Sequence, residues 1–262
     1  MYKVIWMKFP ERTRVLYEEN PLTDVICHFD FPRVLAIDNE LPVDFQKLLV
    51  SRYPLLKTRS VRQRPTAETS DEITGRRLIY EFSSANEQNM ILLGSDFLGV
   101  RTFKYERWES FREGIETALR TLLATYTLSV FTGISLNYVN VVNKEALGLK
   151  DVPWGELIRS SLIGPLSETE VVDDSLEEMH SSFAVPIGVG HLRILSALVE
   201  PDDEKTTTCF SIDNEFTFDE SVDADESKAL AILRQFNLES GRVFRWCITE
   251  RLHQALRPTP IA

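Results

Sequence analysis

The sequence predicts an α+β protein made of two β-α-β-β-β-α repeats, with antiparallel sheet and two long helices packed on one face. Three observations support this prediction. Short segments alternate between apolar and polar residues, as strands with one buried face do. Two long segments place apolar residues at helical spacing. The strand candidates are joined by short segments with turn residues, which favours antiparallel pairing.

The composition allows a substantial core. The chain has 262 residues, of which 43% are hydrophobic, enough for one large domain or two of about 130 residues. Its three cysteines are odd in number and far apart, which argues against a disulfide framework and indicates a reducing cytoplasm. Residues 121–143 are uncharged and long enough to span a bilayer, but they are rich in Ser, Thr and Asn. We therefore expect no membrane segment, and no targeting segment is visible.

The first repeat is expected over residues 21–128, after an N-terminal extension at 1–20. It opens with a strand in "TDVICHFDF" and continues with a helix in "LPVDFQKLLVSRYP", where Phe45, Leu48 and Leu49 lie at helical spacing and Pro54 ends the run. Residues 57–75 are polar and are expected to form a loop. Three strands follow, in "RRLIYEFS", "NMILLGSD" and "LGVRTFKY". A long amphipathic helix then begins at Trp108.

The second repeat is expected over residues 129–255, followed by a tail at 256–262. "GISLNYVNVVN" is a strand, "PWGELIRSSLI" a short helix, and "HSSFAVPIG", "GHLRILSALVE" and "TTTCFSIDNEFTF" are three more strands. "PIGVGH" between the first two of these is expected to be a hairpin turn. A long helix is predicted from about Glu226 to Leu252, and the pair Asp223 and Glu226 has capping-box spacing at its start.

The stretch "DVICHFDFPR" places a cysteine, a histidine and an aspartate within four positions. In an alternating strand, Cys27 and His28 point to opposite faces of the sheet, so they cannot bind one metal ion together. We interpret Cys27 as a core residue and His28 as a residue of the polar face. The chain also lacks Cys-x-x-Cys, His-x-His and His-Glu-x-x-His motifs, so no metal site is predicted.

Several segments resemble a family of sporadically distributed, uncharacterised bacterial and archaeal proteins of similar length. The resemblance covers residues 20–253 and rests on "NPLTDVICHFDF", "LPVDFQKLLVSRYP", "YERWESF", "ISLNYVNVV" and "FRWCIT". In the central strand Tyr138 and Asn140 match the family pattern, whereas Asn137 replaces an Arg, and Asn237 replaces a His common in the last helix. The family has no established activity to carry over. Its patchy distribution implies exchange by mobile elements, and hence a defence or toxin–antitoxin setting.

No catalytic residue is predicted. Nucleophilic catalysis would need a Ser or Cys close to a base, and neither a Gly-x-Ser-x-Gly motif nor a Gly-rich phosphate loop occurs. Paired carboxylates are abundant, but their spacing selects no pair. The sequence therefore implies no cofactor, and it leans against an enzyme without deciding the question.

Charge is distributed unevenly around a net value of −11. Residues 168–228 carry seventeen acids and three bases, whereas residues 52–77 carry seven bases and three acids. Candidate anion- or nucleic-acid-binding residues lie in the basic stretch: Arg59, Arg62, Arg64, Arg76 and Arg77. They could bind phosphates with salt-dependent affinity, or they could neutralise acidic neighbours within the chain.

A second candidate site lies on the last long helix. Asn237 falls on its apolar side, where a buried amide needs a hydrogen-bond partner. Helix packing explains this position, and a ligand pocket formed by Asn237, Tyr138 and Asn140 is the alternative.

The leading hypothesis is a non-catalytic cytoplasmic interaction protein that binds a protein partner, as an antitoxin or accessory factor of a mobile defence system. An acidic surface suits a basic partner. The alternative is a nucleic-acid or nucleotide sensor that uses the sheet face and the basic 57–77 loop. An enzyme ranks third. Oligomeric state, and whether the repeats share a sheet, are left open.

Overall fold

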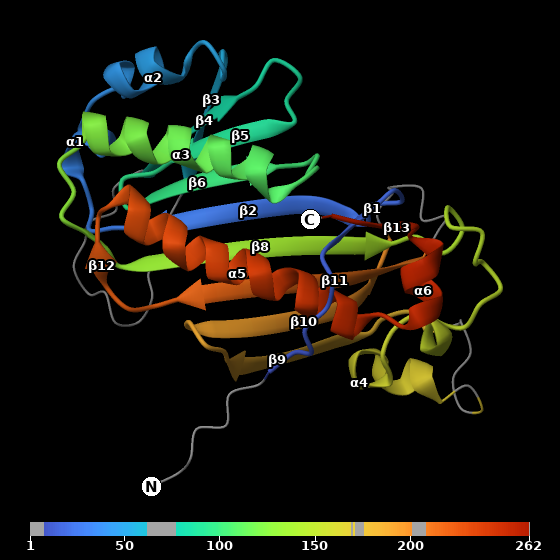
Figure 1. Cartoon of the computed structure of the whole chain (residues 1–262). Coiled ribbons are helices and arrows are strands. Elements are labelled where there is room, and N and C mark those ends of the chain that lie inside the picture. Colours follow the sequence, from blue (N-terminus) through green and yellow to red (C-terminus); the bar gives the residue numbers. More distant parts are fainter. Residues whose placement is uncertain (1–7, 62–76, 169, 171–175, 201–207, 262) are drawn as a thin grey trace, which may run out of the picture. The chain divides into compact units, whose positions relative to one another are not determined.

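Figure 1 shows the computed structural model, which describes residues 8–61, 77–168, 170, 176–200 and 208–261. The fold is α+β with a large antiparallel sheet, as predicted. The chain divides into two compact units. Unit 1 comprises residues 1–25, 136–218 and 232–262, and unit 2 comprises residues 26–135 and 219–231. Among the described residues, no helix is both long and apolar enough to cross a membrane.

Nine strands pair in the order β3-β4-β5-β6-β2-β8-β11-β10-β9. Their bounds are β2 Leu22–Asp30, β3 Leu55–Val61, β4 Arg77–Ser83, β5 Asn89–Leu93, β6 Phe97–Thr102, β8 Gly133–Val142, β9 His180–Pro186, β10 His191–Val199 and β11 Cys209–Phe218. Strands β2 and β8 contribute residues to both units, because the division falls after residues 25 and 135.

The core of unit 2 lies between helix α3 (Trp108–Thr125) and strands β4, β5 and β6. Its apolar stripe is buried as predicted: Trp108, Phe111, Ile115, Leu119 and Leu122. Helix α3 packs against β6 and against α2 (Val43–Leu49), which follows the short helix α1 (Leu35–Asn39). A small pair, β7 (Val130–Phe131) with β12 (Val222–Asp223), completes the unit.

The core of unit 1 lies between its part of helix α5 (Glu226–Cys247) and strands β8, β10 and β11 (Figure 1). The rings of Phe216 on β11 and Phe236 on α5 are 5.6 Å apart. Helix α4 (Ser160–Ile163) lies between 3-10 turns at Trp154–Glu156 and Gly164–Ser167 and contacts β10. Strand β1 (Val15–Tyr17) pairs with β13 (Pro258–Pro260), two segments that are more than 240 positions apart in the sequence.

The polar stretch predicted as a loop is partly a strand. Residues 57–61 belong to β3, which pairs with β4 along its whole length, while residues 62–75 of the predicted loop lie outside the described residues. The prediction was wrong for 57–61 because the described side chains Leu55–Ser60 are all exposed. An edge strand exposed on both faces shows no alternation of apolar and polar residues.

The predicted last helix is two helices. Helix α5 ends at Cys247, and α6 runs from Glu250 to Ala255. Ile248 forms an isolated bridge with Ile158, and the Thr249 amide donates to the Leu157 carbonyl at 2.9 Å. The Thr249 side chain then accepts from the Leu252 amide and caps α6. At the start of α5, Asp225 and not Asp223 accepts from a first-turn amide, that of Lys228.

Candidate protein-binding surface

One segment of unit 2 exposes an unusual number of large apolar side chains. Within residues 35–56, seven such side chains are between 37% and 74% exposed: Leu35, Leu41, Val43, Leu48, Val50, Leu55 and Leu56. We call this set the 35–56 apolar surface. Single exposed apolar residues are ordinary, but a concentration of this kind is typical of a protein-binding site.

Helix α2 contributes residues from the central part of the 35–56 segment, and its buried side chains hold it against the core of unit 2. Phe45 and Leu49 are buried, and the Phe45 ring lies 5.4 Å from that of Phe82 on β4. Leu56 on β3 is the strand partner of the same Phe82, so Phe82 of β4 contacts both α2 and β3. The sequence places Leu48 on the inner stripe of α2, yet its side chain is 56% exposed.

Strand β3 adds an open backbone edge to this surface. It is the last strand of the sheet in the order given above, with β4 as its neighbour. Among the described residues nothing pairs with its outer edge, which leaves backbone amide and carbonyl groups for another strand. Unit 2 therefore combines exposed apolar side chains with a pairing edge, and sequence periodicity did not reveal either.

Two of the predicted basic residues are described, and both form ion pairs within unit 2. On β3, the Nε of Arg59 lies 2.6 Å from Oε1 of Glu81, a carboxylate that is almost fully buried. On β4, Arg77 pairs with Asp96. Arg62, Arg64 and Arg76 lie outside the described residues. The Arg59 and Arg77 contacts match the alternative in which the basic stretch neutralises acids of the same chain.

Of the three residues predicted as a possible ligand pocket, Tyr138 and Asn237 contact each other. Tyr138 on β8 donates from its hydroxyl to Oδ1 of Asn237 on α5 at 3.1 Å. Asn140, also on β8, is buried and donates from Nδ2 to the Ile212 carbonyl at 3.3 Å. These bonds are made inside unit 1, between helix and sheet. They give the Asn237 and Asn140 amides partners within the chain, as the packing interpretation requires.

A buried residue that the sequence did not indicate lies on the same face of the sheet. Asn214 on β11 is fully buried, and neither of its side-chain polar atoms has a hydrogen-bond partner among the described residues. On its own strand the same face carries Ile212 and Phe216, which are both buried. An amide in such surroundings lowers stability rather than raising it.

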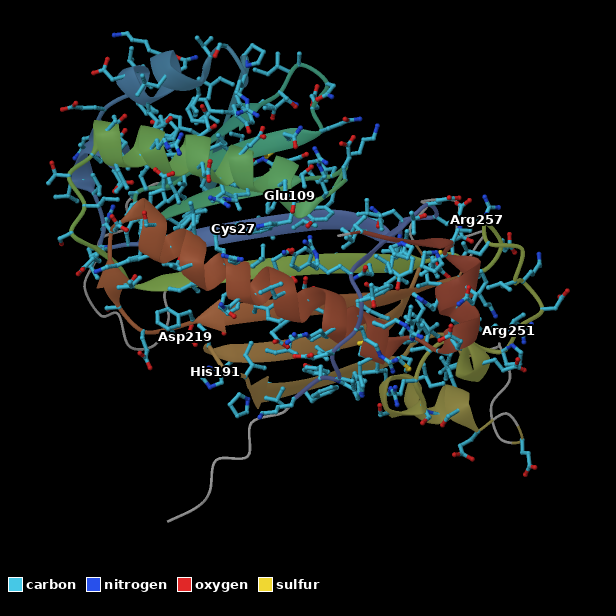
Figure 2. All side chains as sticks on the ribbon, viewed as in Figure 1. Cys27, Glu109, His191, Asp219, Arg251 and Arg257 are labelled. Atoms are coloured by element: carbon cyan, nitrogen blue, oxygen red, sulfur yellow. The ribbon has the colours of Figure 1, made fainter. Side chains whose placement is uncertain are left out.

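The cysteine and histidine of the first strand separate as predicted. Figure 2 labels Cys27 on β2. Cys27 is fully buried, and burial raises the pKa of its thiol well above the ordinary value. His28 lies on the other face, with its ring stacked on Phe97 at 5.2 Å and its Nε2 over Gly99 of β6. Burial lowers the pKa of His28, and the nearby Asp30 opposes that shift. Over the described residues no three His, Cys, Asp or Glu side chains converge as metal ligands would.

On the sheet face of unit 1 that is opposite α5, two acidic side chains lie near Asp213 of β11. Burial raises the pKa of Asp213 to about 6, a hydrogen bond from Asn137 opposes the rise, and Glu215 and Asp24 add to it. Glu215 in turn forms an ion pair with Arg193 at 3.4 Å. One Asp213 carboxylate oxygen, Oδ1, is buried without a described hydrogen-bond partner. The ionised carboxylate is therefore poorly compensated.

We expect Asp213→Asn to stabilise the protein above pH 7. Because the folded state binds the proton at a higher pH than the unfolded chain does, the free energy of unfolding rises as pH falls from about 7 towards 4. A shift of this size corresponds to about 3 kcal/mol, which partial exposure reduces to about 1 kcal/mol. Denaturation of the variant and the parent protein at pH 7.5 and pH 5 measures this free energy. The variant should be more stable than the parent at pH 7.5, and its stability should depend less on pH. Equal pH dependence in both proteins would contradict the assignment.

Comparison with known proteins adds no relative: no family model matches the chain, and no curated protein matches it significantly.

Proposed function

We propose that this is a non-catalytic interaction protein whose protein partner docks on the 35–56 apolar surface and the edge of β3. The observation that carries the proposal is the exposure of seven large apolar side chains within one short segment. Burying such side chains against a partner yields about 25 cal/mol for each Å² of apolar area. An interface of ordinary size needs an apolar centre of this kind.

The charge of the chain supports a basic partner. The net charge of −11 attracts a positively charged protein and accelerates its encounter at low salt. Within this proposal, the apolar surface provides the affinity and the acidic residues provide the long-range attraction. A toxin that handles nucleic acid is a basic protein of this type, and the chain would act as its antitoxin or accessory factor.

The defence setting and the cytoplasmic location are parts of the same proposal. The setting rests on the resemblance of residues 20–253 to a sporadically distributed family. The location is supported by the three cysteines, which are buried and form no disulfide bond.

We also propose that the chain contains an internal repeat of plan. In the strand order, β2 is followed outwards by β6, β5 and β4, and β8 is followed outwards by β11, β10 and β9. In each half, the strand that comes last in the sequence therefore lies beside the strand that comes first. The additional edge strand β3 has no counterpart beyond β9 among the described residues. In this view β3 and the partner surface are additions to the first copy.

Native mass spectrometry of the protein purified from its own host tests the proposed function, with the products of adjacent genes co-expressed as a second source. We expect an additional protein mass of stoichiometric amount. The variant Leu48→Asp should lose this additional mass, because burying a charge in an apolar contact has a large desolvation cost. Leu238→Asp is the matched control, since Leu238 is also exposed but lies on α5 in unit 1.

Two results would contradict the proposal. The first is a chain that carries no other protein from either source. The second is a partner that Leu48→Asp and Leu238→Asp retain equally. For the antitoxin role, co-expression should restore growth to cells that carry the toxic partner, and Leu48→Asp should fail to do so.

A further inference from the structure

We propose that unit 2 also binds a small phosphate-bearing anion, in a pocket separate from the 35–56 apolar surface. The pocket has a volume of about 340 Å³ and lies between the start of α3, the end of β6 and the turn that joins β4 to β5. This volume is at the lower end of the range for small-molecule sites. All of its lining residues belong to unit 2.

The charge of the lining identifies the class of ligand. Four cationic side chains line the pocket against two carboxylates, those of Glu106 and Glu113. The cations are Arg52, Arg101, Lys104 and Arg107. In a chain with a net charge of −11, a concave site with a cationic excess is a local reversal of charge. Such a site attracts anions, and three guanidinium groups suit the paired oxygens of a phosphate.

Three of the four cations retain donors for a ligand. Arg52 uses one terminal nitrogen, Nη1, to donate to Thr117 Oγ1 at 3.1 Å. Lys104 forms no ion pair with any residue in the described ranges. Arg107 makes one long contact, from Nε to Ser110 Oγ at 3.5 Å. Within the described residues, Arg52, Lys104 and Arg107 are therefore not neutralised by a carboxylate in the way that Arg59 and Arg77 are.

A tyrosine hydroxyl in the wall adds a hydrogen-bond donor to the pocket. Tyr53 is only 5% exposed, lines the pocket, and has no hydrogen-bond partner for its hydroxyl among the described residues. The hydroxyl lies beside Gly114 of α3, where an added Cβ would be 3.4 Å from it. The hydroxyl is not one of the fully buried atoms that lack a partner, so it is accessible from the pocket, where an anion oxygen could accept its proton.

The first turn of α3 adds a weaker contribution in the same direction. The helix has 18 residues, and Arg107 at its N-cap provides no side-chain acceptor for the first-turn amides. These amides and the helix dipole favour negative charge at this end. Together with the four cations and the Tyr53 hydroxyl, they define a site for a phosphate group.

Isothermal titration calorimetry of the full chain with pyrophosphate, AMP and adenosine tests the inference. We expect pyrophosphate and AMP to bind and adenosine not to bind, with an affinity that falls as salt increases. Arg52→Gln and Lys104→Gln should each weaken AMP binding by about tenfold, since each removes a charge-assisted hydrogen bond. Tyr53→Phe should weaken it by about threefold. Circular dichroism checks that each variant is folded.

Arg112→Gln is the matched control. Arg112 lies on the same helix, is paired with Glu116, and does not line the pocket, so its replacement should leave AMP affinity unchanged. Absence of binding by both phosphate compounds would overturn the inference. Equal effects of Arg112→Gln and the pocket variants would overturn it too. A single-stranded oligonucleotide that binds through the same residues more tightly than AMP would instead assign the site to nucleic acid.

Discussion

Replacing Phe45 by alanine is expected to lower the free energy of unfolding by about 3–5 kcal/mol and to weaken partner binding. Phe45 is fully buried, and its ring lies 5.4 Å from Phe82 and 6.4 Å from Tyr126. Helix α2 has only seven residues, so packing and not its own hydrogen bonds holds it in place. Without the Phe45 ring, α2 loses its anchor, and the apolar side chains that it presents to the partner lose their fixed positions.

Thermal denaturation followed by circular dichroism measures the first effect, and native mass spectrometry with the partner measures the second. Phe210→Ala is the control: Phe210 is equally buried, packs on Trp154 at 5.4 Å, and lies in unit 1. It should cost similar stability and leave the partner bound at temperatures where the variant is folded. If both variants lose the partner to the same extent, α2 has no special role in binding.

Replacing Gly190 by alanine is expected to cost about 3 kcal/mol or more of stability. Gly190 ends the turn between β9 and β10. Its φ is +74°, a backbone angle that residues other than glycine rarely adopt. A Cβ at this position would lie 1.9 Å from the Thr217 carbonyl oxygen of β11. The obstacle is backbone in a paired strand, since His191 and Thr217 are register partners, so relief requires β10 and β11 to separate locally.

Gly188→Ala in the same turn is the matched control. No heavy atom lies within 4 Å of its added Cβ, so its cost should stay within about 0.5 kcal/mol. Denaturation curves of the two variants and the parent protein compare them directly. Similar stabilities for both variants would show that the turn relaxes and that the close approach to Thr217 is not maintained.

Local periodicity was a reliable guide where an element has one buried and one open face. The alternation in β2 correctly separated Cys27 from His28, and the helical stripe that begins at Trp108 is the buried face of α3. The "PIGVGH" turn was also predicted correctly, because Gly and Pro restrict the local backbone regardless of context. In these segments, residues that are close in the sequence determine which side chains are buried.

Periodicity failed where burial depends on a distant neighbour. Strand β3 is exposed on both faces, so it carries no alternation, and only its pairing with β4 makes it a strand. The break after Cys247 depends on the bridge between Ile248 and Ile158, about ninety residues away in the sequence. The pairing of β1 with β13 joins segments that lie more than 240 positions apart in the sequence. None of these contacts leaves a signal in adjacent residues.

The candidate sites follow the same division. The sequence marked the basic stretch and the Asn237 helix, and it placed Tyr138 and Asn140 on one strand. It could not indicate that Arg59 and Arg77 are paired with acids of their own unit. One signal for the 35–56 apolar surface was available: α2 and its flanks carry apolar residues on more than one side, which a surface helix without a partner does not need.

The sequence by itself determined the α+β class, most of the strands and the apolar faces of the two long helices, because these depend on residues two to four positions apart. Only the tertiary structure decided the strand order, the edge position of β3, the exposed side of α2 and the cationic pocket beside α3. The physical reason is that exposure and charge compensation are properties of neighbours in space, which chain pairing brings together from distant positions.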